Sequence, residues 1–280
     1  MKHKLIFSFV LILSVVLGAG IAPAQGVTNT SRAGCNALPP WDQLQAALKM
    51  ARAKDNGGLN LDMWGTIVDR DGVVCAVAFT GASRSDQWPG SRVISAQKAN
   101  TANAFSLPKL ALSTANLYAA TQPGGSLFGL QLSNPVSTDI AYSGNPENDG
   151  QANDPMVGGR IGGVNVFGGG LGLYNSKHEL VGGIGVSGDT SCADHNIAYW
   201  TRHILGLDFV PAGVAGGDKQ DNIIFDIVPQ GGGEAALPGN AGQMPGISPS
   251  GFGHASCHGY SVAGNGISAG FAAGLPSNSK

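Results

Sequence analysis

Apolar side chains recur at helical spacing in several segments of the chain, and these segments predict its helices. In residues 41–51, for example, Leu44, Leu48 and Ala51 share one face of a helix. Pro108 separates two further segments, because proline cannot continue a helix. We expect helices over residues 41–51, 93–105, 110–120 and 191–205.

Runs of β-branched and other apolar residues predict the strands. Residues 63–68 and 73–79 are two such runs, and the tight turn Asp69–Gly72 between them is typical of a β-hairpin. We expect further strands over residues 164–167, 171–174, 180–186 and 221–228. Hairpins that alternate with helices favour an α+β fold, a layered architecture in which helices flank an antiparallel β-sheet.

The stretch from Leu180 to Leu205 reads as a buried strand, a glycine-serine turn and a helix. Ser191 and Asp194 have the spacing of a capping box at the start of that helix. The predicted core stripe of the helix contains Ala193, Ile197, Trp200 and Ile204. The opposite, polar face carries His195, Tyr199 and Arg202. A turn with free backbone amides beside a polar helical face is the first place to look for a site.

The ends of the chain differ in composition from its middle. Residues 1–24 have a positive start, an apolar run and an A-x-A cleavage site, which together predict a signal peptide and a secreted or periplasmic protein. We expect an arm over residues 25–40, one domain over 41–206 with a long loop insertion at 121–160, and an extension over 207–280. The extension is rich in Gly and Pro, so we expect it to wrap the domain.

Charge excludes some classes of partner. The chain has 16 Lys and Arg and 18 Asp and Glu; without Lys2 and Lys4 the balance is 14 − 18 = −4. So weak an acidic balance argues against binding to nucleic acids. Beyond the signal peptide, no later segment is long and apolar enough to span a membrane.

The four cysteines are an even number in a chain with an export signal, so disulfides are expected. Four cysteines allow three pairings, and the sequence alone does not choose among them. The pairing that we expect is Cys35–Cys75 and Cys192–Cys257. It would join the N-terminal arm to the first hairpin and the C-terminal tail to helix 191–205.

Two enzymatic readings of the glycine-serine turn are open. Gly183-x-Gly185-x-x-Gly188 matches a dinucleotide-binding pattern, but a preceding hairpin and a secreted location argue against it. Ser187 with Asp194 and His195 would be a hydrolase alternative, although neighbours on a helix point in different directions.

Two segments resemble the GlcG/HbpS family, which is related to the C-terminal domain of PduO-type proteins. They are Ser95–Phe105 (SAQKANTANAF) and Val181–Gly188 (VGGIGVSG), the latter followed by Asp194. The likeness covers about residues 41–205. It implies an antiparallel sheet flanked by helices, frequent assembly into homo-oligomers, and haem, corrinoid or other tetrapyrrole ligands.

The chain departs from that family in three places: the 121–160 insertion, Asn165 where many members have proline, and the tail after Asp208. The resemblance supplies no ligand set, so we assign one from the residues. A neutral imidazole is a suitable axial donor to haem iron, and we expect His195 to be that donor, with His258 as the second candidate. His254 and His258 could also share a metal, but two histidines leave a tetrahedral site incomplete.

Other parts of the ligand site follow from charge and position. Lys98 and Arg202 are candidates to pair with haem propionates, and Ser187 and Asp194 lie at the same turn. The sequence therefore predicts an exported haem- or tetrapyrrole-binding protein that is a homo-oligomer and leans away from enzymatic activity. The alternative is a periplasmic enzyme or accessory module that acts on a small metabolite through this turn.

Overall fold

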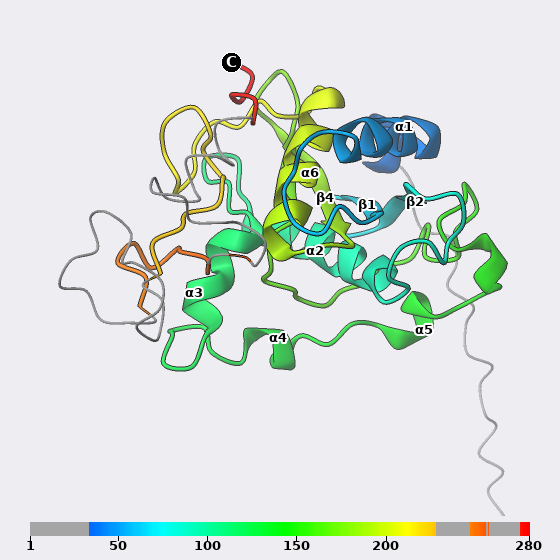
Figure 1. Ribbon diagram of the computed structural model, residues 1–280, viewed down its shortest axis with the longest axis horizontal. Coiled ribbons are helices and arrows are strands. Elements are labelled where there is room, and N and C mark those ends of the chain that lie inside the picture. The colour runs from blue at the N-terminus through cyan, green and yellow to red at the C-terminus, as the bar shows by residue number, and fades with distance from the viewer. Residues whose placement is uncertain (1–33, 228–246, 256, 258–274) are drawn as a thin grey trace, which may run out of the picture. The chain divides into compact units, whose positions relative to one another are not determined.

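The structure is a computed structural model that describes residues 34–227, 247–255, 257 and 275–280 (Figure 1). The predicted signal peptide, most of the arm and His258 lie outside the described residues. No helix in the described part of the chain has the length and apolar character that a membrane crossing needs.

Four strands form one sheet, and each strand is antiparallel to its neighbours. They are β1 (Trp64–Asp69), β2 (Val74–Phe79), β3 (Gly170–Tyr174) and β4 (Leu180–Ser187), in the order β2-β1-β4-β3. Asp69 shapes the predicted β1–β2 turn, because its carboxylate accepts hydrogen bonds from the backbone amides of Asp71 and Val73. The predicted α+β class with an antiparallel sheet is confirmed.

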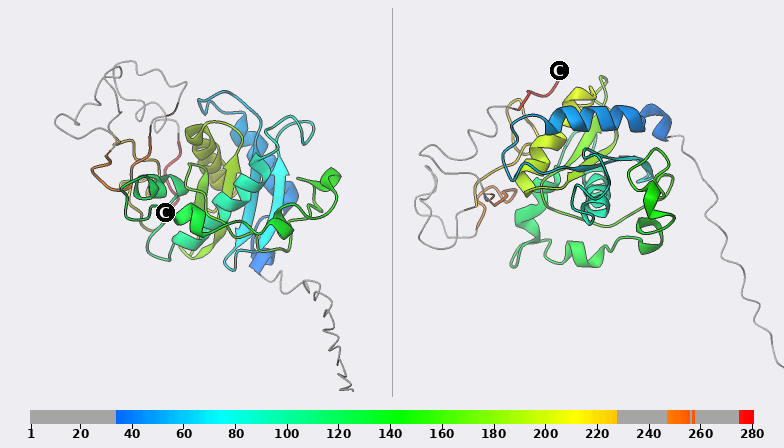
Figure 2. Two further views of the ribbon diagram at one scale, coloured as in Figure 1. Left: turned by 90° about the horizontal axis from the view of Figure 1, so that it is seen from below. Right: turned by 45° about the vertical axis from the view of Figure 1, so that its right-hand side comes forward.

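Helices cover both faces of this sheet (Figure 2). α1 (Trp41–Arg52) and α6 (Ser191–Ile204) pack on one face, and α2 (Ser91–Phe105) packs on the other. The short helix η1 (Gly34–Ala37) precedes α1. Strand residues alternate between the two cores: Ile67 and Ile184 face α1 and α6, and Val68 and Val77 face the α2 side.

The glycines of β4 let α2 approach the sheet closely. A Cβ atom at Gly185 would lie 1.9 Å from the carbonyl oxygen of Ser95, and one at Gly183 would lie 2.4 Å from that of Ala99. Any side chain at these positions would collide with helix backbone. The glycine pattern therefore serves helix–sheet packing, which removes the reason to read it as a dinucleotide motif.

The 121–160 insertion packs against the sheet edge and α2. It contains α4 (Leu130–Ser133), α5 (Thr138–Ala141) and η3 (Pro146–Asn148). Arg92 on α2 holds it through two hydrogen bonds to the carboxylate of Asp154, 2.8 and 2.5 Å long, and a third to the carbonyl of Ala141. Backbone hydrogen bonds between Val74 and residues 158–159 extend the contact along β2.

Three predicted elements are wrong. Residues 110–120 form η2 (Thr114–Leu117) and part of α3 (Tyr118–Thr121), because the Ser113 side chain caps the amide of Asn116 and starts a new short helix. Residues 164–167 are not a strand. They follow Gly162 and Gly163, which have positive φ, and the amides of Asn165 and Val166 donate to side chains.

The third is the predicted strand at 221–228, whose described residues 221–227 are irregular. The carbonyl of Asn222 accepts from the Asn116 side chain and that of Ile224 from the His254 amide, so no strand ladder forms. Both expected disulfides, Cys35–Cys75 and Cys192–Cys257, are present.

Candidate functional site

Thr190 caps the N-terminus of α6: its side chain accepts a hydrogen bond from the amide of Ala193 at 3.3 Å. The predicted capping box of Ser191 and Asp194 is therefore wrong. The Asp194 carboxylate turns back to the β4–α6 turn and accepts from the amides of Gly188, at 3.1 Å, and Asp189, at 2.8 Å. It is freed from capping because threonine already fills that role.

Lys98 and Asp194 form a buried ion pair between α2 and α6. The Lys98 Nζ atom lies 2.6 Å from the Asp194 carboxylate and also donates to the carbonyl of Val186, at 3.1 Å. The two side chains are 1% and 4% exposed, so the pair joins helices on opposite faces across the end of β4.

Burial opposes both charges of this pair. It raises the pKa of Asp194 to about 6, against the lowering effect of Lys98 and of the Asp189 amide. It also lowers the pKa of Lys98 from its ordinary value, and Asp194 opposes that change. Each of the two charges is therefore stabilised by its partner rather than by water.

His195 is the most unusual side chain of the site. It is fully buried, and neither ring nitrogen has a hydrogen-bond partner among the described residues. Burial, followed by the nearby charge of Arg202, lowers the pKa of His195 to about 3. A side-chain interaction with Asn222 acts in the opposite direction and raises that pKa, although no contact to either nitrogen has the geometry of a hydrogen bond. His195 is therefore a neutral imidazole with free coordinating capacity at neutral pH.

The predicted polar face of α6 is not exposed to solvent. His195, Tyr199 and Arg202 are each 0% exposed, whereas Trp200, predicted to be in the core, is only partly buried. The reason is the tail: Asp221 pairs with Arg202, Asn222 lies beside His195, and Ile223 packs with Cys192. Residues 221–223 thus run along α6 and cover His195 and Arg202, whereas Tyr199 packs in the core beside α1 and donates to the Asn278 side chain.

Arg202 holds residues 221–223 in place. Its guanidinium donates to both oxygens of Asp221, at 2.6 and 2.8 Å, and to the carbonyl of Gly172 at 3.1 Å. Burial is the largest single influence on the pKa of Arg202 and lowers it. The charge and hydrogen bonds of Asp221 act in the opposite direction, and the pKa of Arg202 is raised overall. The sequence offered Arg202 as a candidate but gave no signal that Asp221, nineteen residues later, would be its partner.

The family model for "Haem degrading protein HbpS-like" matches residues 40–200 of this chain. That match spans more than half of the sequence. The chain belongs to the HbpS-like family. The resemblance drawn from the Ser95–Phe105 and Val181–Gly188 segments is confirmed.

Three solved structures are also similar to parts of this HbpS-like chain. A complex of PduOC with haem is 24% identical with a TM-score of 0.41, over 59% of this chain and 91% of that one. The Klebsiella pneumoniae protein ORFY is 24% identical with a TM-score of 0.40, over 59% and 86%. HbpS is 17% identical with a TM-score of 0.37, over 68% and 96%. A search of curated proteins found no match.

The HbpS-like chain has no Ser–His–Asp arrangement at the predicted turn. Asp194 is engaged by Lys98, and the nitrogens of His195 have no hydrogen bond to Ser187 or to any other described residue. Ser187 is buried at the end of β4, where it pairs with Trp64. The geometry gives no support to the hydrolase alternative.

Proposed function

We propose that this HbpS-like protein binds haem and that His195 is the donor to the haem iron. The family is described as haem degrading, and the most similar structure named above contains haem. The observation that carries the assignment is a fully buried, neutral His195 whose ring nitrogens have no hydrogen bond among the described residues. Buried polar atoms without partners are costly, so such a residue is a candidate for a ligand contact.

The donor chemistry fits haem, but the space beside His195 is closed by the tail. Four cavities bordered by described residues, of about 170 to 650 Å³, have no histidine in their linings. Residues 221–223 would therefore have to move away from α6 before a porphyrin could reach His195. A propionate could pair with Lys98 or Arg202 only by displacing Asp194 or Asp221.

His203 offers a matched control for a haemin titration, because it lies on the same helix but is partly exposed and paired with Asp208. We expect wild-type protein and His203→Ala to shift the Soret band of haemin, and His195→Ala to lose the shift. A Soret shift that persists in His195→Ala would overturn the assignment. Loss of the shift in His258→Ala alone would show that His258, in the tail, is the donor.

We infer that the protein is exported and that cleavage after Ala24 leaves Gln25 as the first residue. The signal-like composition of residues 1–24 supports this, and two disulfides fit an oxidising compartment. The test is the N-terminal peptide mass of protein from the culture supernatant or periplasm. Protein that retains residues 1–24 in that fraction would contradict cleavage.

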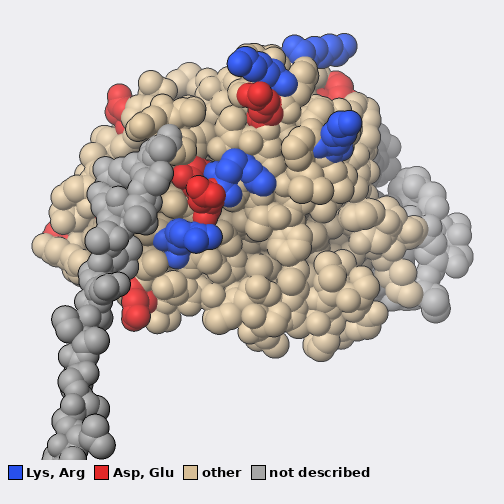
Figure 3. Space-filling view, turned by 180° about the vertical axis from the view of Figure 1, so that it is seen from behind, with Lys and Arg blue, Asp and Glu red and all other residues tan. Residues whose placement is uncertain are grey.

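We also infer that the protein is a homo-oligomer. Leu127, Phe128 and Leu132 of the insertion are 39%, 64% and 85% exposed, which is unusual for large apolar side chains so close together in sequence. Figure 3 shows that one face of the molecule has broad areas without charged side chains. A second copy of the chain would bury Leu127, Phe128 and Leu132.

A further inference from the structure

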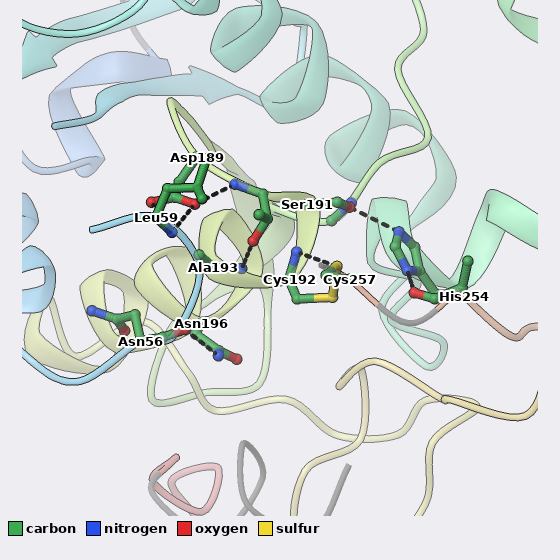
Figure 4. Close-up of a disulfide and its surroundings, with 12 residues drawn as sticks. Asn56, Leu59, Asp189, Ser191, Cys192, Ala193, Asn196, His254 and Cys257 are labelled. Carbon is green, nitrogen blue, oxygen red and sulfur yellow. Dashed lines mark hydrogen bonds between the residues drawn. A yellow bond between two sulfur atoms is a disulfide. The ribbon is translucent and has the colours of Figure 1, made fainter. Parts of the chain in front are cut away.

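A second group of ligand-forming side chains lies at the start of α6, on the tail side. Cys192, His254 and Cys257 bring two sulfurs and a ring nitrogen within 4.8 Å of one another (Figure 4). In the oxidised protein the two sulfurs form a disulfide. Two thiolates and one imidazole are a common donor set for zinc.

Hydrogen bonds to both ring nitrogens fix the tautomer of His254. Its Nδ1 atom lies 2.6 Å from the carbonyl oxygen of Ala255, so Nδ1 carries the hydrogen and donates it. Nε2 is then the acceptor, and Ser191 Oγ lies 2.8 Å from it. A backbone carbonyl that holds one ring nitrogen is the usual support of a metal-bound histidine.

Contacts outside the disulfide keep His254 in place. Its backbone amide donates to the carbonyl of Ile224 at 2.8 Å, and its ring packs at 4.7 Å from that of Tyr118. The ring would therefore stay beside the sulfurs after the S–S bond opened.

The surroundings of Cys192–Cys257 favour its reduction. The backbone amide of Cys192 donates to Cys257 Sγ at 3.1 Å, and Cys192 is the second residue of a fourteen-residue helix. A helix N-terminus and an amide donor both stabilise a thiolate. Cys257 is only partly buried whereas Cys192 is 1% exposed, so Cys257 is the more accessible half of the disulfide.

The other disulfide has the opposite surroundings. Asp69 lies within 4.8 Å of Cys35 and Cys75, and one of its carboxylate oxygens is buried with no hydrogen bond among the described residues. The Cys75 sulfur also lies 3.5 Å from the carbonyl of Val73. Negative and acceptor groups raise the free energy of a thiolate, so this disulfide should resist reduction longer.

We propose that a dithiol reductant opens Cys192–Cys257 and that the two freed sulfurs bind Zn²⁺ together with His254. The first thiolate of the reductant attacks Cys257 Sγ and expels the Cys192 thiolate; the second thiol of the reductant then releases Cys257 and leaves as a disulfide. Zinc displaces the protons of both cysteines, and Nε2 exchanges the Ser191 hydroxyl for the metal. This site does not use His195, so it is independent of the proposed haem donor.

Zinc binding requires the two sulfurs to move apart. They are bonded to each other in the disulfide, and Zn–S bonds of about 2.3 Å in a tetrahedral site put two sulfurs about 3.8 Å apart. The His254 ligand atom already lies within 4.8 Å of both sulfurs. The fourth position is left to water, because Cys257 is partly exposed. The disulfide and the bound metal are then alternative cross-links between the tail and α6.

The experiment uses the mature protein, oxidised and after graded treatment with dithiothreitol that is removed without air before titration with Co²⁺ as a probe and Zn²⁺ as competitor. We expect one metal per chain and a thiolate-to-cobalt charge-transfer band in the reduced protein only. Alkylation and mass mapping should show that Cys192 and Cys257 are reduced before Cys35 and Cys75. Metal binding by oxidised protein, or none by reduced protein, would overturn the proposal.

Variants assign the ligands. Cys192→Ser/Cys257→Ser should lose the band, and Cys35→Ser/Cys75→Ser should keep it. His254→Ala retains both disulfides as purified, so it tests the zinc site even if the Cys192→Ser/Cys257→Ser variant does not fold. Its zinc affinity after reduction should fall by more than the roughly 10- to 100-fold expected for loss of a supporting group. Affinity equal to wild type, or a band that depends on Cys35 and Cys75, would overturn the site.

Discussion

Arg202 and Asp221 form a two-point ion pair in which both side chains are fully buried, and this pair holds the tail against α6. The Arg202 guanidinium also donates to the carbonyl of Gly172 on β3, so it lies between the sheet and the tail. His195 lies on the same helix and is enclosed beside Asn222. Access to His195 therefore depends on how firmly Arg202 and Asp221 hold residues 221–223.

Asp221→Ala should destabilise the protein by about 3–5 kcal/mol, because it leaves the Arg202 charge buried and unpaired. Urea unfolding measures the change. Asp218→Ala is the control, since its pair with Lys219 is exposed and should contribute little. Equal stability of the two variants would show that the Arg202–Asp221 pair does not hold the tail.

The Lys98–Asp194 pair predicts a pH dependence. The pKa of Asp194 is raised by burial to about 6 from its ordinary 3.8. Because the folded protein binds this proton more tightly than the unfolded chain, Asp194 makes its full contribution to stability below the pKa of the unfolded state. That contribution is lost as the pH rises through 6. Between about pH 4 and pH 6 the wild type should lose at most about 3 kcal/mol of unfolding free energy from this group.

Asp194→Asn removes this titration and supplies the comparison. The difference in unfolding free energy between wild type and variant should change between pH 4 and pH 6 and stay constant from pH 6.5 to pH 8. A difference that is flat over the whole range would mean that Asp194 has no raised pKa in the folded protein.

Gly185→Ala should destabilise the fold by about 3 kcal/mol or more, because the new Cβ would meet the Ser95 carbonyl at 1.9 Å. Gly90→Ala is the matched control: its Cβ would have no neighbour within 4 Å, and its φ of −63° suits alanine. Thermal unfolding should show a large fall for the first variant and almost none for the second. Similar melting temperatures would refute the packing role of the β4 glycines.

Light scattering tests the proposed oligomer. The wild type should have a multiple of the monomer mass, and Leu132→Asp should shift the protein toward monomer by placing a charge on the exposed apolar surface of the insertion. Met50→Asp changes a side chain that is also exposed, at 57%, but lies on α1, and it should not alter the mass. A monomeric wild type would contradict the inference.

Local patterns were enough to predict the centre of the fold. The β1–β2 hairpin, α2 and α6 follow from periodicity and turn residues. The cysteine pairing was also predicted correctly. The hairpin and the helices depend on residues that are close together in the chain, and four cysteines allow only three pairings.

The environment of the site could not be predicted in the same way. Periodicity distinguishes apolar from polar faces, but it cannot show whether a polar face meets solvent or a polar segment from elsewhere. It assigns His195 and Arg202 to a polar face but gives no sign that Asp221 and Asn222 cover them. Asp194 was misread as a cap because its real partner, Lys98, is ninety-six residues away.

The most direct test of the haem proposal is chemical rescue of the missing imidazole. Ferric haem bound to wild type should give the spectrum of a histidine-ligated iron. His195→Gly should lose that spectrum, and added free imidazole should restore it by entering the space that the side chain leaves. A His195→Gly spectrum identical to wild type without imidazole would contradict the account.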